Sequence, residues 1–480
     1  MPPTLLPTAS QFLVTSLPNL TSDFLSLLPN GLYAGYLPTT KETRNPNNYF
    51  FLYYPSANVS SNSLTVWLNG GPGCSSLLGA FTENGPILIN ENGSFSENKY
   101  SWHLLSNMLY VEQPVGTGFD VDTMNRTYDE IVVGNEFHAF LDNFYSVFEN
   151  TKKFNLFITG ESYAGTYIPY IAQNLIQAKN LTDGSPINLR GIAIGNGLFD
   201  VNAQQGPAST VDNFDFLHES GFLDSYSEEF RTQLSELATK CRAMSSSDEF
   251  YLQDGCDLAW YVTEIYNATH SDLGAGNSCF NLYNIDFSAP CVWGSDHLWR
   301  QESQLTTLMN NFVIQSALHV GSYLSHLKDT FSWNMCNNIN IQPTSYNPPS
   351  HELLNVIIKA GIDVVLYDGN RDYVCNYMQV ERVISNATWN GARGFQRGPA
   401  AWTVSSRNAG LIWAERGLTY IRVFDAGHML PADQPGSALA LFQRILAGAG
   451  QSAPVQMTTS QAWKGYINVA IILFGLIFAV

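Results

Sequence analysis

Hydrophobic residues along the chain fall into short continuous runs and into longer stretches with helical spacing. Short runs rich in aromatic and β-branched residues predict buried strands at 48–54, 63–68, 109–111, 154–159, 191–195, 362–367 and 418–424. Apolar positions at helical spacing predict helices at 129–150, 167–177 and 231–244. Strands that alternate with helices are typical of an α/β fold with a central, mostly parallel sheet and helices on both faces.

The alternation of strands and helices stops between about residues 201 and 342. Four of the seven cysteines fall in the loop-rich stretch 241–291, which favours an inserted subdomain over a continuation of the core. One large α/β domain with an insertion fits the length of 480 residues. We therefore divide the chain into a first core part, an inserted cap-like subdomain, a second core part, and a polar spacer with a hydrophobic tail. These parts are 1–200, 201–342, 343–450 and 451–480.

The strand predicted at 154–159 runs into a tight turn before the helix at 167–177. The turn reads Gly160-Glu161-Ser162-Tyr163-Ala164-Gly165. Small residues let a hydroxyl stand clear of the backbone, and the N-terminus of the following helix favours developing negative charge. The usual pattern is G-x-S-x-G, and Ala164 is small enough to replace its second glycine. The turn makes Ser162 a candidate nucleophile.

Two later strand ends supply the partners that a serine nucleophile needs. The strand at 362–367 leads into Asp368 and Asp372, and the strand at 418–424 leads into His428. A histidine would take the proton of Ser162, and a carboxylate would fix the tautomer of the imidazole. The chain order serine, acid, histidine is that of α/β-hydrolases. Both acids are candidates for the third position on this pattern alone.

A glycine-rich loop follows the strand at 63–68. It reads Asn69-Gly70-Gly71-Pro72-Gly73-Cys74-Ser75-Ser76. Glycines let backbone amides approach a ligand closely, and a loop at this place in an α/β-hydrolase builds the oxyanion hole. An ordinary turn is the alternative interpretation.

Composition and charge exclude several classes of function. The net charge of −18 argues against nucleic acid or an anionic membrane as the main partner and suits an acidic compartment. There is no Cys-x-x-Cys or His-Glu-x-x-His motif, so we predict no metal and no cofactor. Singly scattered cysteines favour disulfides with one thiol left over. Sequons for N-glycosylation begin at Asn19, Asn58, Asn92, Asn125, Asn180, Asn267 and Asn386.

The two ends of the chain give conflicting signals on location. Residues 1–40 contain no Lys or Arg, so no secretory signal is visible. Residues 467–480 are almost wholly apolar, yet fewer than the roughly 20 that span a bilayer. A glycolipid-anchor signal is predicted by the order of three segments: small residues at 448–453, a polar spacer at 456–464 and this apolar tail. A short membrane helix and a packed terminal helix are the alternative interpretations of the tail. We expect a secreted or surface-tethered protein, or one in the vacuole or another acidic secretory compartment, with membrane contact only through the tail.

Five ordered blocks between about residues 12 and 446 resemble the serine carboxypeptidase family, a branch of the α/β-hydrolases, and most of all its fungal secreted members. The blocks lie at 67–76, 83–86, 160–165, 372–376 and 427–429. The resemblance implies an α/β-hydrolase fold that releases C-terminal residues from peptides and proteins through an acyl-enzyme. The family's loop G-D-x-D maps onto residues 369–372, which implies Asp372 as the acid and leaves Asp368 as a turn residue. The amides of Gly71 and Tyr163 would form the oxyanion hole.

The resemblance also implies how a free α-carboxylate is held. Asn69, the amide of Gly70, Glu83 and Glu161 match the family's carboxylate-binding positions. Three clustered anions cannot all ionise, so the glutamates must share protons, which predicts tight binding in acid and weaker binding as pH rises. The bland alternative is that Glu83 caps a turn and Glu161 is merely exposed.

Further residues take their expected roles from the same resemblance. Cys375 and Met429 would line the substrate's side-chain site, as would Trp67, for which core packing is an equal alternative. The other six cysteines allow fifteen pairings, and the resemblance suggests Cys74–Cys336, Cys241–Cys256 and Cys279–Cys291. Relatives of this fold use the same triad for acyl transfer from glucose esters, which is the second alternative. The presence of both Glu83 and Glu161 favours binding of a peptide carboxylate over that alternative. A non-catalytic binding protein is the third alternative.

Overall fold

The computed structural model describes most of the chain outside the termini and parts of the insertion. The described residues are 8–17, 28–40, 47–120, 128–207, 209–244, 255–258, 261–262, 278–290, 302–323, 331–339, 341 and 347–448. The hydrophobic tail, Cys291 and the sequons at Asn19, Asn125 and Asn267 lie outside these ranges. Asn58, Asn92, Asn180 and Asn386 are exposed. Within the described ranges no helix has the length and apolar character needed to cross a bilayer.

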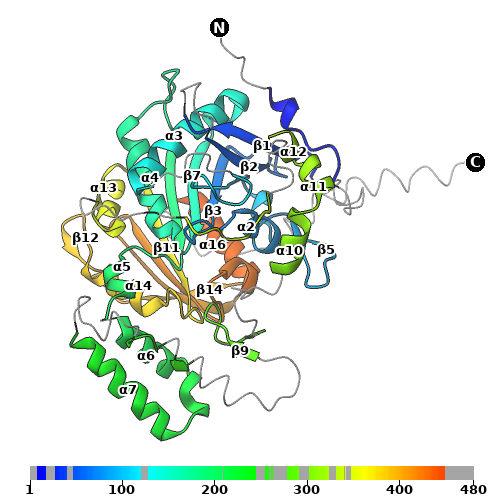
Figure 1. Cartoon of the computed structure of the whole chain (residues 1–480). Helices are drawn as coiled ribbons and strands as arrows, with labels where there is room; N and C mark the ends of the chain where they lie inside the picture. The colour runs from blue at the N-terminus through cyan, green and yellow to red at the C-terminus, as the bar shows by residue number, and fades with distance from the viewer. Residues whose placement is uncertain are drawn as a thin grey trace, which may run out of the picture.

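A ten-stranded sheet runs through the molecule (Figure 1). In spatial order its strands are β1 (Tyr33–Pro38), β2 (Asn48–Tyr54), β6 (Asn107–Val111), β3 (Ser63–Leu68), β7 (Asn155–Glu161), β8 (Leu189–Gly195), β11 (Asp363–Gly369), β16 (Leu418–Val423), β15 (Arg407–Glu415) and β14 (Ala400–Val404). The six strands from β6 to β16 pair in parallel, and the strands at both edges are antiparallel. This arrangement confirms the predicted mostly parallel sheet.

Helices cover both faces of the sheet (Figure 1). The core on one face contains buried residues of α3 (Glu130–Val147), α4 (Ala164–Ala178), α13 (Leu354–Lys359) and α14 (Tyr377–Asn386). The core on the other face contains residues of α2 (Leu77–Thr82) and α16 (Pro435–Ala447). Strand β2 is buried throughout because its alternate side chains enter the two cores, Phe51 on one side and Phe50 on the other. Strands buried on both faces read as continuous apolar runs, which explains why the sequence reveals them.

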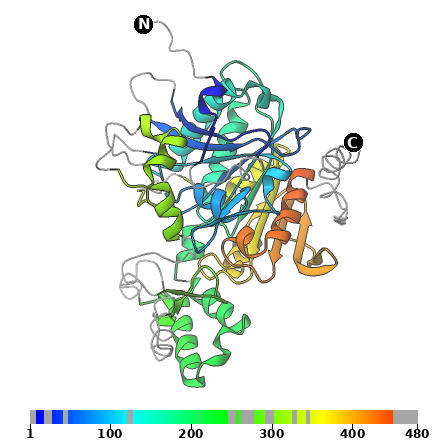
Figure 2. The ribbon, with the colours of Figure 1, turned by 90° about the vertical axis from the view of Figure 1, so that its right-hand side faces the viewer.

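The insertion begins with α5 (Val201–Gln205), α6 (Ser209–Glu219) and α7 (Glu228–Arg242). In two perpendicular views α6 and α7 lie at one end of the molecule, away from β1 and β2 (Figure 2). They have a small core of their own, which Tyr373 and Tyr377 of the second core part join. A disulfide links Cys241 to Cys256. The short strands β9 (Ser278–Phe280) and β10 (Ser288–Pro290) form a separate antiparallel pair.

The last part of the range assigned to the insertion returns to the main core. Its helices are α10 (Glu302–Met309), α11 (Phe312–Ala317) and α12 (Val320–Tyr323). Leu305, Met309, Ile314 and Trp333 are buried in the same core as α2. The part of the insertion that projects from the molecule with α6 and α7, which we call the projecting cap, therefore does not include α10, α11 or α12 and is shorter than 201–342.

Candidate active site

Ser162 lies at the turn between β7 and α4. Its φ of 64° falls in the left-handed region, which residues with a side chain rarely adopt. The Ser162 amide donates to the carbonyl of Gly195 on β8, and the Ser162 carbonyl accepts from the amides of Gly165 and Leu198, each at 2.9 Å. Hydrogen bonds on both sides hold the turn in this unfavourable conformation.

Two glycines of the turn are required by close backbone contacts. A Cβ on Gly160 would lie 2.2 Å from the carbonyl oxygen of Leu68, and one on Gly165 would lie 2.7 Å from the amide nitrogen of Leu198. Ala164, between them in the helix start, is fully buried and keeps its methyl group. The turn therefore tolerates Ala164 in place of the second glycine of the usual motif, because the close contact with the backbone of Leu198 is made by Gly165 instead.

The structure brings His428 and Asp372 together. Nδ1 of His428 lies 2.6 Å from Oδ2 of Asp372, and both side chains are buried. The Asp372 carboxylate also accepts from the backbone amides of Val374 at 2.9 Å and Cys375 at 3.3 Å. An anion fixed in this way orients the imidazole and leaves Nε2 available as a base.

Ser162, Asp372 and His428 follow β7, β11 and β16, whose C-terminal ends share one edge of the parallel sheet. The Ser162 hydroxyl forms no hydrogen bond with any described residue. In free enzymes the contact between nucleophile and base is often long and tightens when substrate binds. The arrangement is therefore compatible with a triad that is completed on binding.

Asp368 corrects one expectation from the sequence. It is a residue of β11, not of a turn, and it is buried. Burial raises the pKa of its carboxyl well above the usual range. The carboxylate that faces the imidazole is that of Asp372, so the geometry separates the two acids that the pattern alone left open.

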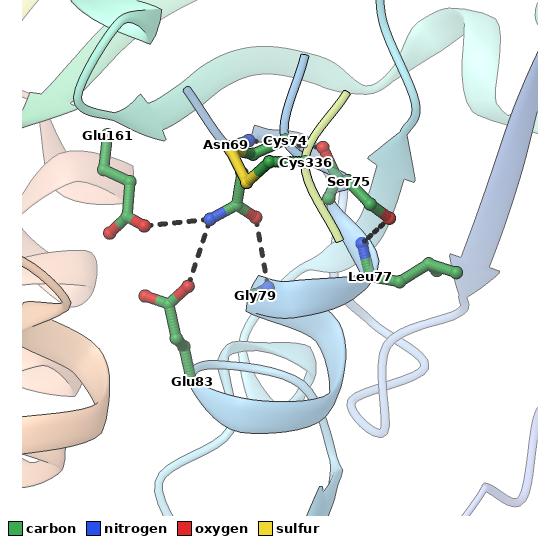
Figure 3. The surroundings of a disulfide bond; sticks show 9 residues. Asn69, Cys74, Ser75, Leu77, Gly79, Glu83, Glu161 and Cys336 are labelled. Carbon is green, nitrogen blue, oxygen red and sulfur yellow. Dashed lines mark hydrogen bonds between the residues drawn. A yellow bond between two sulfur atoms is a disulfide. The ribbon is translucent and has the colours of Figure 1, made fainter. Parts of the chain in front are cut away.

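Asn69 lies at the centre of a cluster of buried polar groups (Figure 3). Its Nδ2 donates to Oε1 of Glu161 at 2.8 Å and to Oε1 of Glu83 at 3.2 Å. Its Oδ1 accepts from the indole of Trp67 at 2.9 Å and from the amide of Gly79 at 3.1 Å. These four bonds fix the side-chain amide with its NH₂ toward the glutamates. Trp67 is thus a core residue that also orients Asn69.

Glu83 and Glu161 are both buried and both accept from Asn69, so Glu161 is not an exposed residue and the side chain of Glu83 belongs to the same cluster. Burial raises the pKa of Glu83 to about 7, against the opposing effect of the Asn69 hydrogen bond. Burial first, and then the negative charge of Glu83, raise the pKa of Glu161 well above its usual range. Apart from the contact between the two glutamates themselves, Oε2 of each forms no hydrogen bond with a described residue. Below pH 7 the pair therefore holds protons that it can donate in hydrogen bonds.

The glycine-rich loop after β3 lies directly against the Ser162 turn. A Cβ on Gly70 would lie 2.5 Å from the amide nitrogen of Tyr163 and 2.7 Å from Cβ of Ser162. The amides of Gly71 and Tyr163 donate no hydrogen bond to the described residues, so both remain available to a ligand. Gly71 has a φ of 112°, which a residue with a Cβ would rarely adopt.

A disulfide joins this loop to the last part of the range assigned to the insertion. Cys74 is bonded to Cys336 (Figure 3), the pair that the family resemblance implied. Ser75 donates its amide to the carbonyl of Met335 at 2.8 Å, and Gly73 accepts from the amide of Asn337 at 2.9 Å. The loop is thus fixed on both sides of the cystine.

The remaining expected side chains lie close to the same site or outside the described residues. Cys375 is a buried free thiol whose pKa burial raises well above the usual range, which makes it unreactive. Met429 is half-buried and directly follows His428. The expected Cys279–Cys291 pair includes Cys291 and so lies outside the described residues.

Sequence reasoning gave no role to two buried glutamates near the site. Glu130 at the start of α3 accepts from the hydroxyl of Tyr163 at 3.1 Å, and burial raises its pKa to about 8. Glu112 accepts from the Ser75 hydroxyl and from the indole of Trp333 at 3.4 Å, and burial raises its pKa to about 7. A glutamate at the start of a helix or just after a strand carries no sequence signal that distinguishes it from a solvated charge.

Comparison with known proteins identifies the family. A family model described as serine carboxypeptidase matches residues 22–448. The chain belongs to the serine carboxypeptidase family. This serine carboxypeptidase is 32% identical over 460 residues to the pheromone-processing carboxypeptidase KEX1 of Debaryomyces hansenii, a match that covers 91% of the chain and 64% of that protein. It is 32% identical over 435 residues to serine carboxypeptidase-like 47 of Arabidopsis thaliana, covering 88% of the chain and 80% of that protein.

The crystal structure of Kex1Δp, a prohormone-processing carboxypeptidase from Saccharomyces cerevisiae, superimposes with a TM-score of 0.75. The two chains are 26% identical, and the match covers 91% of this serine carboxypeptidase and 96% of Kex1Δp. The predicted family, enzyme class and α/β-hydrolase fold are confirmed.

Proposed function

We propose that this serine carboxypeptidase releases C-terminal residues from peptides and proteins with Ser162 as nucleophile, His428 as base and Asp372 as the orienting acid. The observation that carries the proposal is the cluster of Asn69 with two buried glutamates, which adjoins the Ser162 turn through Glu161. A nucleophile beside a site built to donate hydrogen bonds to a carboxylate suits cleavage of the last peptide bond of a chain.

The reaction follows from these groups in two halves. Oγ of Ser162 attacks the scissile carbonyl carbon while Nε2 of His428 takes its proton, and the imidazolium then protonates the departing amine. The acyl-enzyme is hydrolysed by water, which His428 activates in the same way. The amides of Gly71 and Tyr163 stabilise the oxyanion in both halves, and one such donor lowers the barrier by about 3 kcal/mol.

The carboxylate end of the substrate contacts the protonated glutamates, Asn69 and the amide of Gly70. A protonated carboxyl donates a hydrogen bond to the anion without adding a second charge. Trp67 orients Asn69 through the indole bond described above. The substrate's own charge is thus bound by neutral donors, which favours work at acidic pH.

An acidic part of the secretory route is the compartment that we propose. Disulfides persist in oxidising compartments, and the described chain contains two of them. The curated relatives in fungi are named as pheromone-processing enzymes, and secreted peptides are the substrates that we propose here. Glycans at the exposed sequons and the C-terminal lipid anchor belong to the same proposal.

Acyl transfer is the second candidate function, because the same triad can pass an acyl group to an alcohol instead of water. A product that is an ester, with no shortening of the peptide, would favour it. The two buried glutamates favour a peptide carboxylate as the bound group.

Mass spectrometry of a peptide incubated at pH 5 tests the proposal. Stepwise loss of residues from the C-terminus is expected with wild type. Ser162→Ala should lower kcat on the order of 10⁶-fold while the fold remains intact. Ser303→Ala, at an exposed serine on α10, is the matched control and should keep full activity. If Ser162→Ala retained a rate within tenfold of wild type, Ser162 would not be the nucleophile.

A further inference from the structure

A short piece of the insertion lies between the two loops that carry His428 and Asp372. It comprises residues 281–286, which follow β9 and precede β10, and we call it the bracing segment. The segment forms its own tight turn, because Oδ1 of Asn281 accepts from the amides of Tyr283 at 2.9 Å and Asn284 at 3.3 Å. The turn is therefore stabilised by hydrogen bonds within the segment itself.

The bracing segment bonds to both neighbours of Asp372. The amide of Tyr373 donates to the carbonyl of Leu282 at 3.0 Å, and the amide of Ile285 donates to the carbonyl of Arg371 at 3.0 Å. These backbone bonds run in opposite directions on the two sides of Asp372, as in a short antiparallel pair. The Asp372 loop is thus tied to the insertion.

The same segment contacts His428 directly. The amide of His428 donates to the carbonyl of Tyr283 at 2.7 Å, and the ring of Tyr283 lies edge-on to the imidazole at a centroid distance of 5.1 Å. Gly427 must be a glycine here, because a Cβ would lie 2.2 Å from the carbonyl oxygen of Tyr283. The backbone of the His428 loop is therefore packed against the segment.

A side-chain contact completes the attachment. Nδ2 of Asn284 donates to Oδ2 of Asp433 at 2.8 Å, and the same oxygen accepts from the amide of Gly427 at 2.7 Å. Asp433 is the last residue of α15 (Leu430–Asp433), which begins two residues after His428. One carboxylate oxygen thus joins the bracing segment, the residue before His428 and the helix after it.

We propose that the bracing segment positions His428 against Asp372, with Asn284 as a positioning residue that acts through Asp433. The two loops leave separate strands, β11 and β16, and the side-chain bond between acid and imidazole is short. A common support for both loops keeps the acid and the imidazole aligned, so the insertion contributes to proton transfer. This inference rests on the proposed role of His428 as base.

Exchange of the donor and the acceptor tests the inference. Asn284→Asp puts two carboxylates face to face and should lower kcat by roughly tenfold to a hundredfold, as small misplacements of catalytic groups do, with KM within twofold of wild type. The double variant Asn284→Asp with Asp433→Asn restores a bond between the two side chains, but the amide of Gly427 then faces a donor in place of its carboxylate acceptor, so it should recover only part of the lost kcat. Asn284→Ala should also lower kcat, and its midpoint of thermal unfolding shows whether the variant folds.

Two measurements separate positioning from general loss of stability. The rate at which a fluorophosphonate labels Ser162 reports activation of the serine without any peptide carboxylate, and it should fall by the same factor as kcat. Asn188→Ala removes side-chain amide bonds at the opposite end of β7 and should change neither rate. The inference is overturned if folded Asn284 variants label at the wild-type rate or if only KM changes. Wild type that labels but does not shorten peptides would instead refute the proposed function.

Discussion

The affinity of this enzyme for a peptide's free carboxylate should fall as the pH rises above 7. Glu83 and Glu161 have raised pKa values because they are buried together, and Asn69 is the only neutral donor that bonds to both among the described residues. The protons are present below the raised pKa and are lost above it. Once they are lost, the site presents negative charge to an anion.

The size of the effect follows from the pKa of Glu83, which is about 7. If binding requires the proton, the dissociation constant is nearly constant from pH 5 to 6 and about twofold weaker at pH 7. At pH 8 only about one site in eleven is competent, so binding is about tenfold weaker, or about 1.4 kcal/mol.

Calorimetric titration of Ser162→Ala with a blocked dipeptide at pH 5, 6, 7 and 8 measures this affinity without turnover. The same dipeptide with a C-terminal amide carries no charge, so its weaker binding should not vary with pH. The double variant Glu83→Gln with Glu161→Gln cannot ionise and should bind the acid with no pH dependence in this range. If Ser162→Ala, with both glutamates intact, bound the acid with the same affinity from pH 5 to 8, the shared-proton reasoning would be refuted.

Three further perturbations have expected outcomes. Burial raises the pKa of Glu112 to about 7, so its ionisation destabilises the folded state as the pH rises from about 4.5 to 7. In urea titrations the free energy of unfolding should therefore fall between pH 5 and 8 by about 2 to 3 kcal/mol less in Glu112→Gln than in wild type. Equal pH dependence of the two proteins would contradict this. Cys336→Ser should lower the free energy of unfolding by about 4 kcal/mol, and a midpoint equal to that of wild type under oxidising conditions would show that the Cys74 bond adds nothing. Gly165→Ala forces a methyl group against the backbone of Leu198 and should lower kcat at least tenfold, whereas an unchanged kcat would mean that the turn adapts freely.

The central strands could be predicted from the sequence, and the edge strands could not. β2 and β3 occupy the predicted residues because every side chain in them is buried, which gives a continuous apolar run. β14 is mostly exposed and β15 carries charged residues at both ends, so neither has the apolar signature of a buried strand. Their pairing with β16 comes from the sheet itself, whose edge they extend.

The sequence predicts only those residues of the site that have a local sequence signature. Ser162, Asp372 and His428 stand at strand ends in glycine-marked loops, and these have local signatures. The bond between Asn284 and Asp433 joins residues 149 positions apart and has none. Nor does the sequence distinguish a buried glutamate such as Glu112 from a solvated one, because burial is decided by segments that fold over it.

The cystine between Cys74 and Cys336 has a consequence for any chain that is cut within the projecting cap. Such a cut would leave the nucleophile on one polypeptide, and the base and acid on the other. The sulfur bridge spans 262 positions, so both pieces would travel as one covalent molecule and would separate only in a reducing agent under denaturing conditions. Loss of an intact chain on a reducing gel would then be no measure of lost activity.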